Sequence, residues 1–199
     1  MAILVVLGVR LVYLKLQETI ILILLLFFAS PTYSQKIGEF TGLDIPRFVA
    51  TKSDDINLRV GPSKNYPIKL KYIVKNYPLE VFDEYNNWRK VSDHEGNEGW
   101  IHKNLLKGER YAITLSKTND YLNVFNYPNG KKIGLVKSKN ITKLKKCIKD
   151  WCLIEINNLI GWTSKENLWG IYENEIYKIN YFHPIIVLLW KLRSSYILN

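Results

Sequence analysis

The sequence predicts an all-β protein of two small β-barrels in tandem, preceded by a hydrophobic N-terminal helix. Three observations predict this fold class: an internal repeat, short strand-like stretches separated by turn residues, and no sustained helical period after the N-terminal segment. The chain has 199 residues, of which 47% are hydrophobic and 23% charged, as in globular proteins. This length accommodates one large domain or two small ones.

The N-terminal segment is the first predicted element. From Thr19 to Ala29 the chain reads TIILILLLFFA, an apolar run that suits a secretory signal and is short for a membrane span. Lys15 supplies positive charge before this run, and small residues predict cleavage after Ser34. Residues 1–34 are therefore expected to be a signal peptide or, if uncleaved, a membrane anchor. Either form would export residues 35–199 to the periplasm, free or attached to the inner membrane.

Two terminal features are less informative. Residues 1–13 are unusually apolar for the start of a signal peptide, so translation from near Leu14 is an alternative start. Residues 173–199 are expected to be a C-terminal extension. Its apolar group Ile185–Trp190 is too short to span a bilayer, and it would either lie on a membrane surface or be disordered.

An internal repeat divides the exported part into two modules. Three pairs of segments align in order, at offsets of 66, 63 and 62 residues: Ile56–Pro62 with Leu122–Pro128, Asn87–Val91 with Asp150–Ile154, and Gly99–Ile101 with Gly161–Thr163. Because the offset shrinks along the chain, the second copy is the same unit with shorter loops. The repeat predicts one module over residues 47–108 and a second over residues 110–172.

Each module has the pattern of β-structure. Short stretches rich in β-branched and aromatic residues alternate with Gly and Asn turns, at Asn57–Val60, Leu79–Phe82, Trp88–Val91 and Gly99–His102 in the first copy. Because a 60-residue module buries little surface, large side chains are expected to fill its core. The expected core residues are Leu58, Val81, Val91 and Trp100 in the first module, and Val124, Leu144, Ile154 and Trp162 in the second.

Four blocks of the first module, in their order, resemble the bacterial SH3-like (SH3b) domain family. The blocks are Ile56–Ser63, Tyr66–Ile68, Asn87–Val91 and Glu98–His102. The second module looks like a degenerate copy, because it keeps Trp151 and Gly161-Trp162 but has Phe125 where the first copy has Arg59. The tandem arrangement is similar to small exported SH3-domain proteins of α-proteobacteria.

The resemblance implies barrels of five to seven strands, of the kind that accompany cell-wall hydrolases and bind peptidoglycan or its peptides. We therefore expect a non-enzymatic exported protein that recognises peptidoglycan or an extended peptide. The alternative is an envelope adaptor that docks another protein through its SH3-like barrels, by an exposed edge or an aromatic patch.

The expected ligand site lies in the first module. Two loops that lie near each other in SH3-like barrels carry aromatic residues, which could form a groove for an extended peptide or a sugar face: Tyr66, Tyr72, Tyr85 and Trp88. Arg59 lies within the strongest block of the motif, where it would either capture a ligand carboxylate or form a structural ion pair.

The two cysteines predict a disulfide. Cys147 and Cys152 flank four residues that can turn a hairpin, which would set the two cysteines opposite each other on adjacent strands. Disulfides form in exported proteins. A zinc site would need further ligands, and no His lies nearby in the sequence, so neither a metal nor another cofactor is expected. A bridged sulfur cannot attack a substrate, and His94 and His102 lie in the other module, so catalysis is not expected.

The formal net charge of +10 favours an anionic partner, such as a membrane surface, a nucleic acid or a cell-wall polymer. Export argues against nucleic acid, which is therefore not an expected partner. The Lys-rich stretch at residues 143–149 is expected to be a solvated strand edge, where lysines discourage pairing with other chains.

Overall fold

The computed structural model describes residues 15–19, 36–116 and 120–179. The chain divides into two compact units, residues 1–35 and 36–199. In the first unit only Lys15–Thr19 is described, and it is helical. The apolar run predicted as a signal or anchor lies outside the described residues apart from Thr19, and so does the apolar group Ile185–Trp190. Within the described ranges, no helix is both long and apolar enough to cross a membrane.

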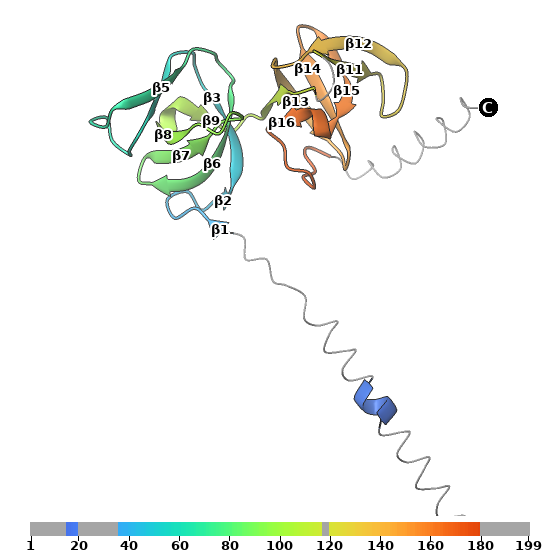
Figure 1. The fold of residues 1–199 in the computed structure, drawn as a ribbon, viewed down its shortest axis with the longest axis horizontal. Coiled ribbons are helices and arrows are strands. Elements are labelled where there is room, and N and C mark those ends of the chain that lie inside the picture. Colours follow the sequence, from blue (N-terminus) through green and yellow to red (C-terminus); the bar gives the residue numbers. More distant parts are fainter. Residues whose placement is uncertain (1–14, 20–35, 117–119, 180–199) are drawn as a thin grey trace, which may run out of the picture. The chain divides into compact units, whose positions relative to one another are not determined.

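The second unit is built from strands, which confirms the all-β prediction, and most of them form two seven-stranded antiparallel sheets (Figure 1). The first sheet has the order β5-β4-β8-β7-β6-β3-β9. Its strands are β3 (Arg47–Thr51), β4 (Ile56–Arg59), β5 (Ile68–Tyr72), β6 (Pro78–Tyr85), β7 (Trp88–Ser92), β8 (Glu98–His102) and β9 (Leu106–Lys107), with the 3-10 helix η1 (Lys103–Leu105) before β9.

The second sheet has the order β12-β11-β15-β14-β13-β10-β16. Its strands are β10 (Tyr111–Thr114), β11 (Tyr121–Phe125), β12 (Lys132–Lys137), β13 (Ile141–Cys147), β14 (Trp151–Ile156), β15 (Leu159–Ser164) and β16 (Leu168–Trp169), with the 3-10 helix η2 (Lys165–Asn167) before β16. Each strand of this sheet therefore occupies the place of the strand numbered seven lower in the first sheet.

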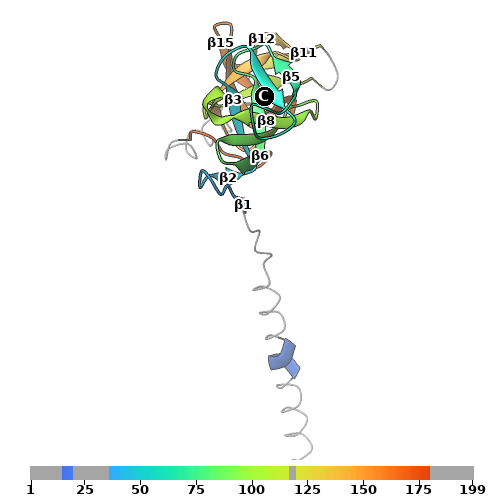
Figure 2. The same cartoon turned by 90° about the vertical axis from the view of Figure 1, so that its left-hand side faces the viewer.

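A short hairpin precedes the first sheet. Strands β1 (Lys36–Ile37) and β2 (Asp44–Ile45) pair with each other, and both views place them at the end of β6 (Figures 1 and 2). We call residues 36–45 the strap. The carboxylate of Glu84, on β6, holds the strap by accepting hydrogen bonds from the backbone N–H groups of Phe40 and Thr41, each at 3.1 Å, and from the Thr41 hydroxyl at 2.7 Å.

The core of the first sheet is close to the one predicted. Leu58, Val81 and Val91 have no exposed surface, as predicted. The assignment of Trp100 to this core is wrong: Trp100 is only half-buried, and Ile101 is fully buried instead. Neighbouring side chains of a strand point to opposite faces, so Ile101 faces the core while Trp100 lies on the other face of β8.

The second sheet has a separate core. The four predicted residues Val124, Leu144, Ile154 and Trp162 are all buried, which confirms the prediction. Val124, Leu144 and Ile154 belong to one packed cluster, which also contains both cysteines.

The predicted disulfide is present. Cys147 and Cys152 face each other across β13 and β14 with their Cα atoms 4.1 Å apart, and their sulfur atoms are bonded. The same hairpin corrects the prediction for residues 143–149. Most of this stretch lies on β13, which pairs with β14 on one side and β10 on the other, so it is not a strand edge. The edges of this sheet are β12 and β16.

Removing the disulfide is expected to destabilise the second sheet modestly. The crosslink joins residues only five positions apart, and the entropy that a crosslink removes from the unfolded chain falls with loop length. Replacing both cysteines by alanine should therefore lower the free energy of unfolding by about 2 kcal/mol. Chemical denaturation of both forms measures this difference. Two thiols that alkylate without reduction in the intact protein would contradict the assignment.

Aromatic contacts connect the two sheets. The ring of Phe48 on β3 lies 5.1 Å from that of Trp169 and 4.7 Å from that of Tyr172, measured between ring centroids. The hydroxyl of Tyr172 donates a hydrogen bond of 2.8 Å to the carboxylate of Glu80. Burial and then the carboxylate of Glu80 raise the pKa of this hydroxyl, so it stays protonated at neutral pH.

Candidate functional site

A cavity of about 350 Å³ opens on the first sheet between the loop after β4 and the β6–β7 turn. Two aromatic side chains, a histidine, a lysine and small polar groups line it. Its principal lining residues are Ser63, Lys64, Tyr85, Asn87, Trp88 and His102. We call it the Trp88 cavity.

The β6–β7 turn, which carries the aromatic residues, is held in place by hydrogen bonds to its backbone carbonyls. Asn86 has a φ of 49°, a left-handed conformation that asparagine tolerates better than most residues. The guanidinium of Arg89 donates hydrogen bonds to the backbone carbonyls of Asn86 at 2.9 Å and of Trp88 at 2.8 Å. The backbone N–H of Lys103 donates to the carbonyl of Asn87 at 2.8 Å. These hydrogen bonds fix the backbone from which the rings of Tyr85 and Trp88 project.

The aromatic wall consists of Tyr85, Trp88 and His102. Trp88 and His102 are direct partners across β7 and β8, and their rings meet edge to face with centroids 5.4 Å apart. Trp88 is half-buried, and Tyr85 is 52% exposed. Flat rings with one open face provide stacking area at little cost in side-chain entropy, which suits an extended peptide or a sugar ring.

His102 is neutral at pH 7. Burial lowers the pKa of its imidazole, and the positive charges of Lys64, Lys103 and Arg89 lower it further. Its Nδ1 atom accepts a hydrogen bond of 3.4 Å from the backbone N–H of Asn104, which assigns the ring proton to Nε2. The cavity therefore offers a neutral aromatic wall beside the positive charge of Lys64.

The structure places the other predicted site residues outside this cavity. Arg59 donates a hydrogen bond of 2.7 Å from Nη1 to the backbone carbonyl of Tyr66, so it stabilises the loop after β4. The ring of Tyr66 covers Gly61, where a Cβ atom would come within 2.6 Å of the ring carbons. Tyr66 is 47% exposed, but neither it nor Arg59 lines the Trp88 cavity.

The prediction for Tyr72 is wrong, because its ring is part of the core. The side chain is 6% exposed, and its hydroxyl donates a hydrogen bond of 3.0 Å to the buried carboxylate of Asp93. Burial and the charge of Asp93 raise the pKa of this hydroxyl well above its usual value. The last residue of β5 points inward here, which the sequence pattern of the loop did not indicate.

Lys64 and His102 line the cavity but are not among the residues that the sequence predicts for the site. His102 stands in the fourth block of the motif, and its spacing from Trp88 across the β7–β8 hairpin is the signal that could have identified it. Among the described residues, no cluster of three His, Cys, Asp or Glu side chains could hold a metal ion.

The second sheet lacks an equivalent aromatic wall. Trp151 faces Ser164 across β14 and β15, where the first sheet has the pair Trp88 and His102. The ring of Phe125 packs edge to face against Trp151 instead, with centroids 5.6 Å apart.

A comparison with protein families matches residues 52–108 to the bacterial SH3 domain. This segment is therefore similar to the bacterial SH3 family, over less than half of the chain. The match begins after β3 and includes every residue that lines the Trp88 cavity.

Other similarities are weak. The chain is 26% identical over 151 residues to the RecBCD enzyme subunit RecB of Buchnera aphidicola, a match that covers 69% of this chain but only 12% of that protein. Among solved structures, NlpC2 from Trichomonas vaginalis has a TM-score of 0.29 and 12% identity, with 68% of this chain and 50% of that chain covered. The CBD of endolysin LysPBC5 has a TM-score of 0.27 and 14% identity, with 68% of this chain and 96% of that chain covered. TM-scores below 0.5 do not establish a shared fold.

Proposed function

We propose that the protein is an exported, non-enzymatic binding protein whose first SH3 domain recognises peptidoglycan or an extended peptide in the Trp88 cavity. The observation that carries this proposal is the position of the cavity. It lies between two loops of the segment that matches the bacterial SH3 family, and its wall is made of the partly open rings of Tyr85 and Trp88.

The chemistry of the cavity supports this ligand class. At about 350 Å³ it is large enough for a few peptide residues or one sugar ring. Tyr85 and Trp88 would supply stacking surface, and the backbone and side-chain amides of Asn86 and Asn87 would supply hydrogen bonds. Lys64 would pair with a carboxylate, a group present at the end of every peptide.

We further propose that residues 47–108 and 110–172 are two SH3-like modules in tandem. The identical strand order of the two sheets and their separate cores support this proposal. Equivalent residues also occupy equivalent register positions: Arg59 pairs with Trp100 in the first sheet, as Phe125 pairs with Trp162 in the second. Because Trp151 has Ser164 as its partner, the ligand site belongs to the first module alone.

Export and the lack of enzyme activity belong to the same proposal. The signal-like sequence of residues 1–34 and the disulfide support an oxidising compartment, the periplasm or the outer face of the inner membrane. Ser63 and His102 both line the Trp88 cavity, but within the described residues no hydrogen bond joins them and no carboxylate orients the imidazole. A nucleophile with its base is therefore not assembled there.

Cosedimentation of the full chain with purified peptidoglycan tests the proposal. Tyr85→Ala and Trp88→Ala should each weaken binding at least fivefold, because aromatic residues at the centre of a binding site typically contribute more than 1 kcal/mol. Tyr121→Ala is the matched control, since Tyr121 on the second sheet is 52% exposed, as Tyr85 is. The control should bind normally. If the folded wild-type protein stays in the supernatant at every salt concentration, peptidoglycan is not the ligand.

A second candidate function is an adaptor that binds another envelope protein. The observation in its favour is the free edge of the first sheet at β5, where Ile68 is 52% exposed. Ile73 and Val74, directly after this strand, are 74% and 47% exposed. An exposed edge strand can pair with an added strand from a partner. Loss of partner binding in Ile73→Asp, with normal peptidoglycan binding, would favour the adaptor role.

A further inference from the structure

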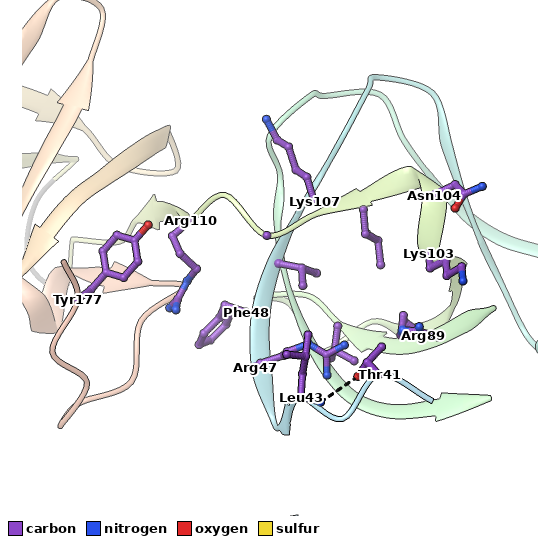
Figure 3. A pocket seen from close by; sticks show the side chains of 14 residues that line it. Thr41, Leu43, Arg47, Phe48, Arg89, Lys103, Asn104, Lys107, Arg110 and Tyr177 are labelled. Carbon is purple, nitrogen blue, oxygen red and sulfur yellow. Dashed lines mark hydrogen bonds between the residues drawn. The ribbon is translucent and has the colours of Figure 1, made fainter. Parts of the chain in front are cut away.

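A larger cavity of about 600 Å³ lies on the side of the first sheet that carries β3, β9 and the strap. Figure 3 shows side chains from these three elements around it, with Thr41 and Leu43 from the strap beside Arg47 and Arg89. Lys103 and Asn104, from η1, line the same end. The cavity does not share a lining residue with the Trp88 cavity.

Positive charge is in excess at this end of the cavity. Arg47 and Arg89 share one carboxylate, that of Glu84, at 2.7 Å and 3.4 Å, so two guanidinium groups meet a single negative charge. Lys103 has no acidic partner within the described part of the chain, and its side chain is exposed. Two positive charges are therefore uncompensated.

The guanidinium of Arg89 lines the cavity and keeps both N–H groups of Nη2 free of partners among the described residues. The residue is 4% exposed; Nε faces Glu84, and Nη1 donates to two backbone carbonyls of the β6–β7 turn. Its Nη2 atom has no hydrogen-bond partner among the residues that the structure describes, although a guanidinium offers five donors. Because Nη2 is not a fully buried atom, its N–H groups are open to an acceptor in the cavity, and a guanidinium favours an anionic one.

The cations at the opposite end of the cavity are already neutralised. Lys107 pairs with Glu109 at 3.0 Å and lies over the ring of Tyr111. Arg110 forms an ion pair with the carboxylate of Glu175 and donates to the carbonyl of Gly170. The excess charge is therefore confined to Arg47, Arg89 and Lys103.

The rest of the wall is apolar. Leu43, Val49, Val81 and Leu106 also line the cavity. A ligand pocket that is mostly apolar with a few convergent polar groups suits a small molecule with a polar head. A bare inorganic anion would leave this apolar surface uncovered.

We propose that this cavity is a second binding site, for a carboxylate or phosphate group carried on a short apolar body. Arg89 and Lys103 hold the anionic group, Thr41 and Asn104 stand beside it, and Leu43 and Leu106 contact the apolar body. This site is independent of the proposed peptidoglycan site, and a failure of one leaves the other intact.

Titration calorimetry of the full chain with octanoate, octyl phosphate, octylamine and inorganic phosphate tests the proposal. At least one of the two alkyl anions should bind, octylamine should not, and inorganic phosphate should bind more weakly than octyl phosphate. Binding by only one alkyl anion identifies the head group. Equal binding of octylamine, or no binding of either alkyl anion to the folded protein, would overturn the proposal.

Variants of Lys103 test the site without disturbing the core, because Lys103 is exposed. Lys103→Gln should weaken binding of the alkyl anion about fivefold, the effect of one partly exposed ion pair, and Lys103→Glu at least tenfold. Lys52→Gln is the matched control, because Lys52 is also exposed but does not line the cavity. Trp88→Ala should bind the alkyl anion normally. Equal affinities for Lys103→Gln and Lys52→Gln would refute the assignment.

Discussion

Glu84→Gln is expected to lower the free energy of unfolding by about 3–5 kcal/mol, as when one partner of a buried ion pair is removed. The carboxylate of Glu84 is 1% exposed and faces two guanidinium groups, those of Arg47 and Arg89. Gln keeps the shape of the side chain but removes its charge, so both cations stay buried without compensation. The same carboxylate holds the strap, which should loosen as well.

Glu98→Gln is the matched control for this substitution. Glu98 lies on β8 of the same sheet, but its side chain is 55% exposed and 4.0 Å from Lys90. Exposed ion pairs of this kind contribute little, so the control should change stability by about 0.5 kcal/mol or less. Urea denaturation followed by tryptophan fluorescence measures both variants. Equal effects would mean that the buried charge of Glu84 does not stabilise the sheet.

The Glu84 carboxylate also predicts a pH dependence. Burial alone would raise its pKa, but hydrogen bonds from Arg47 and Thr41 and the charge of Arg89 outweigh burial, and the pKa falls below the usual 4.5. A carboxyl group with a lowered folded-state pKa stabilises the protein fully above its unfolded pKa, and this contribution is lost as the pH falls through the folded-state pKa. The stability difference between the wild type and Glu84→Gln should therefore be constant near pH 7 and shrink below about pH 4.5.

Gly99→Ala is expected to destabilise the first sheet by about 3 kcal/mol, at the upper end of the cost of overpacking a core. A Cβ atom at this position would lie 2.6 Å from Cγ of Leu58 and 2.7 Å from the backbone carbonyl oxygen of Arg59. A side chain could move away, but the carbonyl belongs to β4, which pairs with β8 at this point. Relief would require the two strands to separate.

Gly108→Ala controls for the general effect of adding a methyl group to glycine. Gly108 lies after β9, and a Cβ atom there would meet nothing within 4 Å. Its stability should be unchanged or slightly higher, because alanine restricts the unfolded chain. Thermal denaturation of both variants provides the comparison. A Gly99→Ala variant as stable as Gly108→Ala would show that β4 and β8 approach each other less closely than the structure indicates.

The sequence predicted the strands of the first sheet well where a local pattern marked them. All four predicted stretches, including Asn57–Val60 and Trp88–Val91, lie within one residue of strands β4, β6, β7 and β8 or inside them. Strand β3 escaped prediction because its partners β6 and β9 are distant in sequence. The strap escaped prediction because each of its strands has only two residues and the side chain that holds it, Glu84, is distant in sequence. The size of Trp100 does not place it in the core, because alternation along β8 decides which face is buried.

The candidate site was predicted in part. Tyr85 and Trp88 line the cavity because the β6–β7 turn is short, and sequence alone identifies residues beside such a turn. Tyr72 has the same aromatic character, but its hydroxyl finds a partner in Asp93, twenty-one positions away, and no local pattern reports that contact. No local sequence pattern links Lys103 to Arg89, because only the folded sheet brings η1 beside β7.

Strand β3 has a consequence for how the first domain can be isolated. It comprises Arg47–Thr51, just before the family match at residues 52–108, yet it lies between β6 and β9 and has Ala50 and Thr51 fully buried. A fragment that starts at residue 52 would leave β6 paired only with β7, with its other edge open, and would detach β9 from the sheet. Exposed strand edges promote self-association, so the minimal soluble fragment must begin upstream of residue 47.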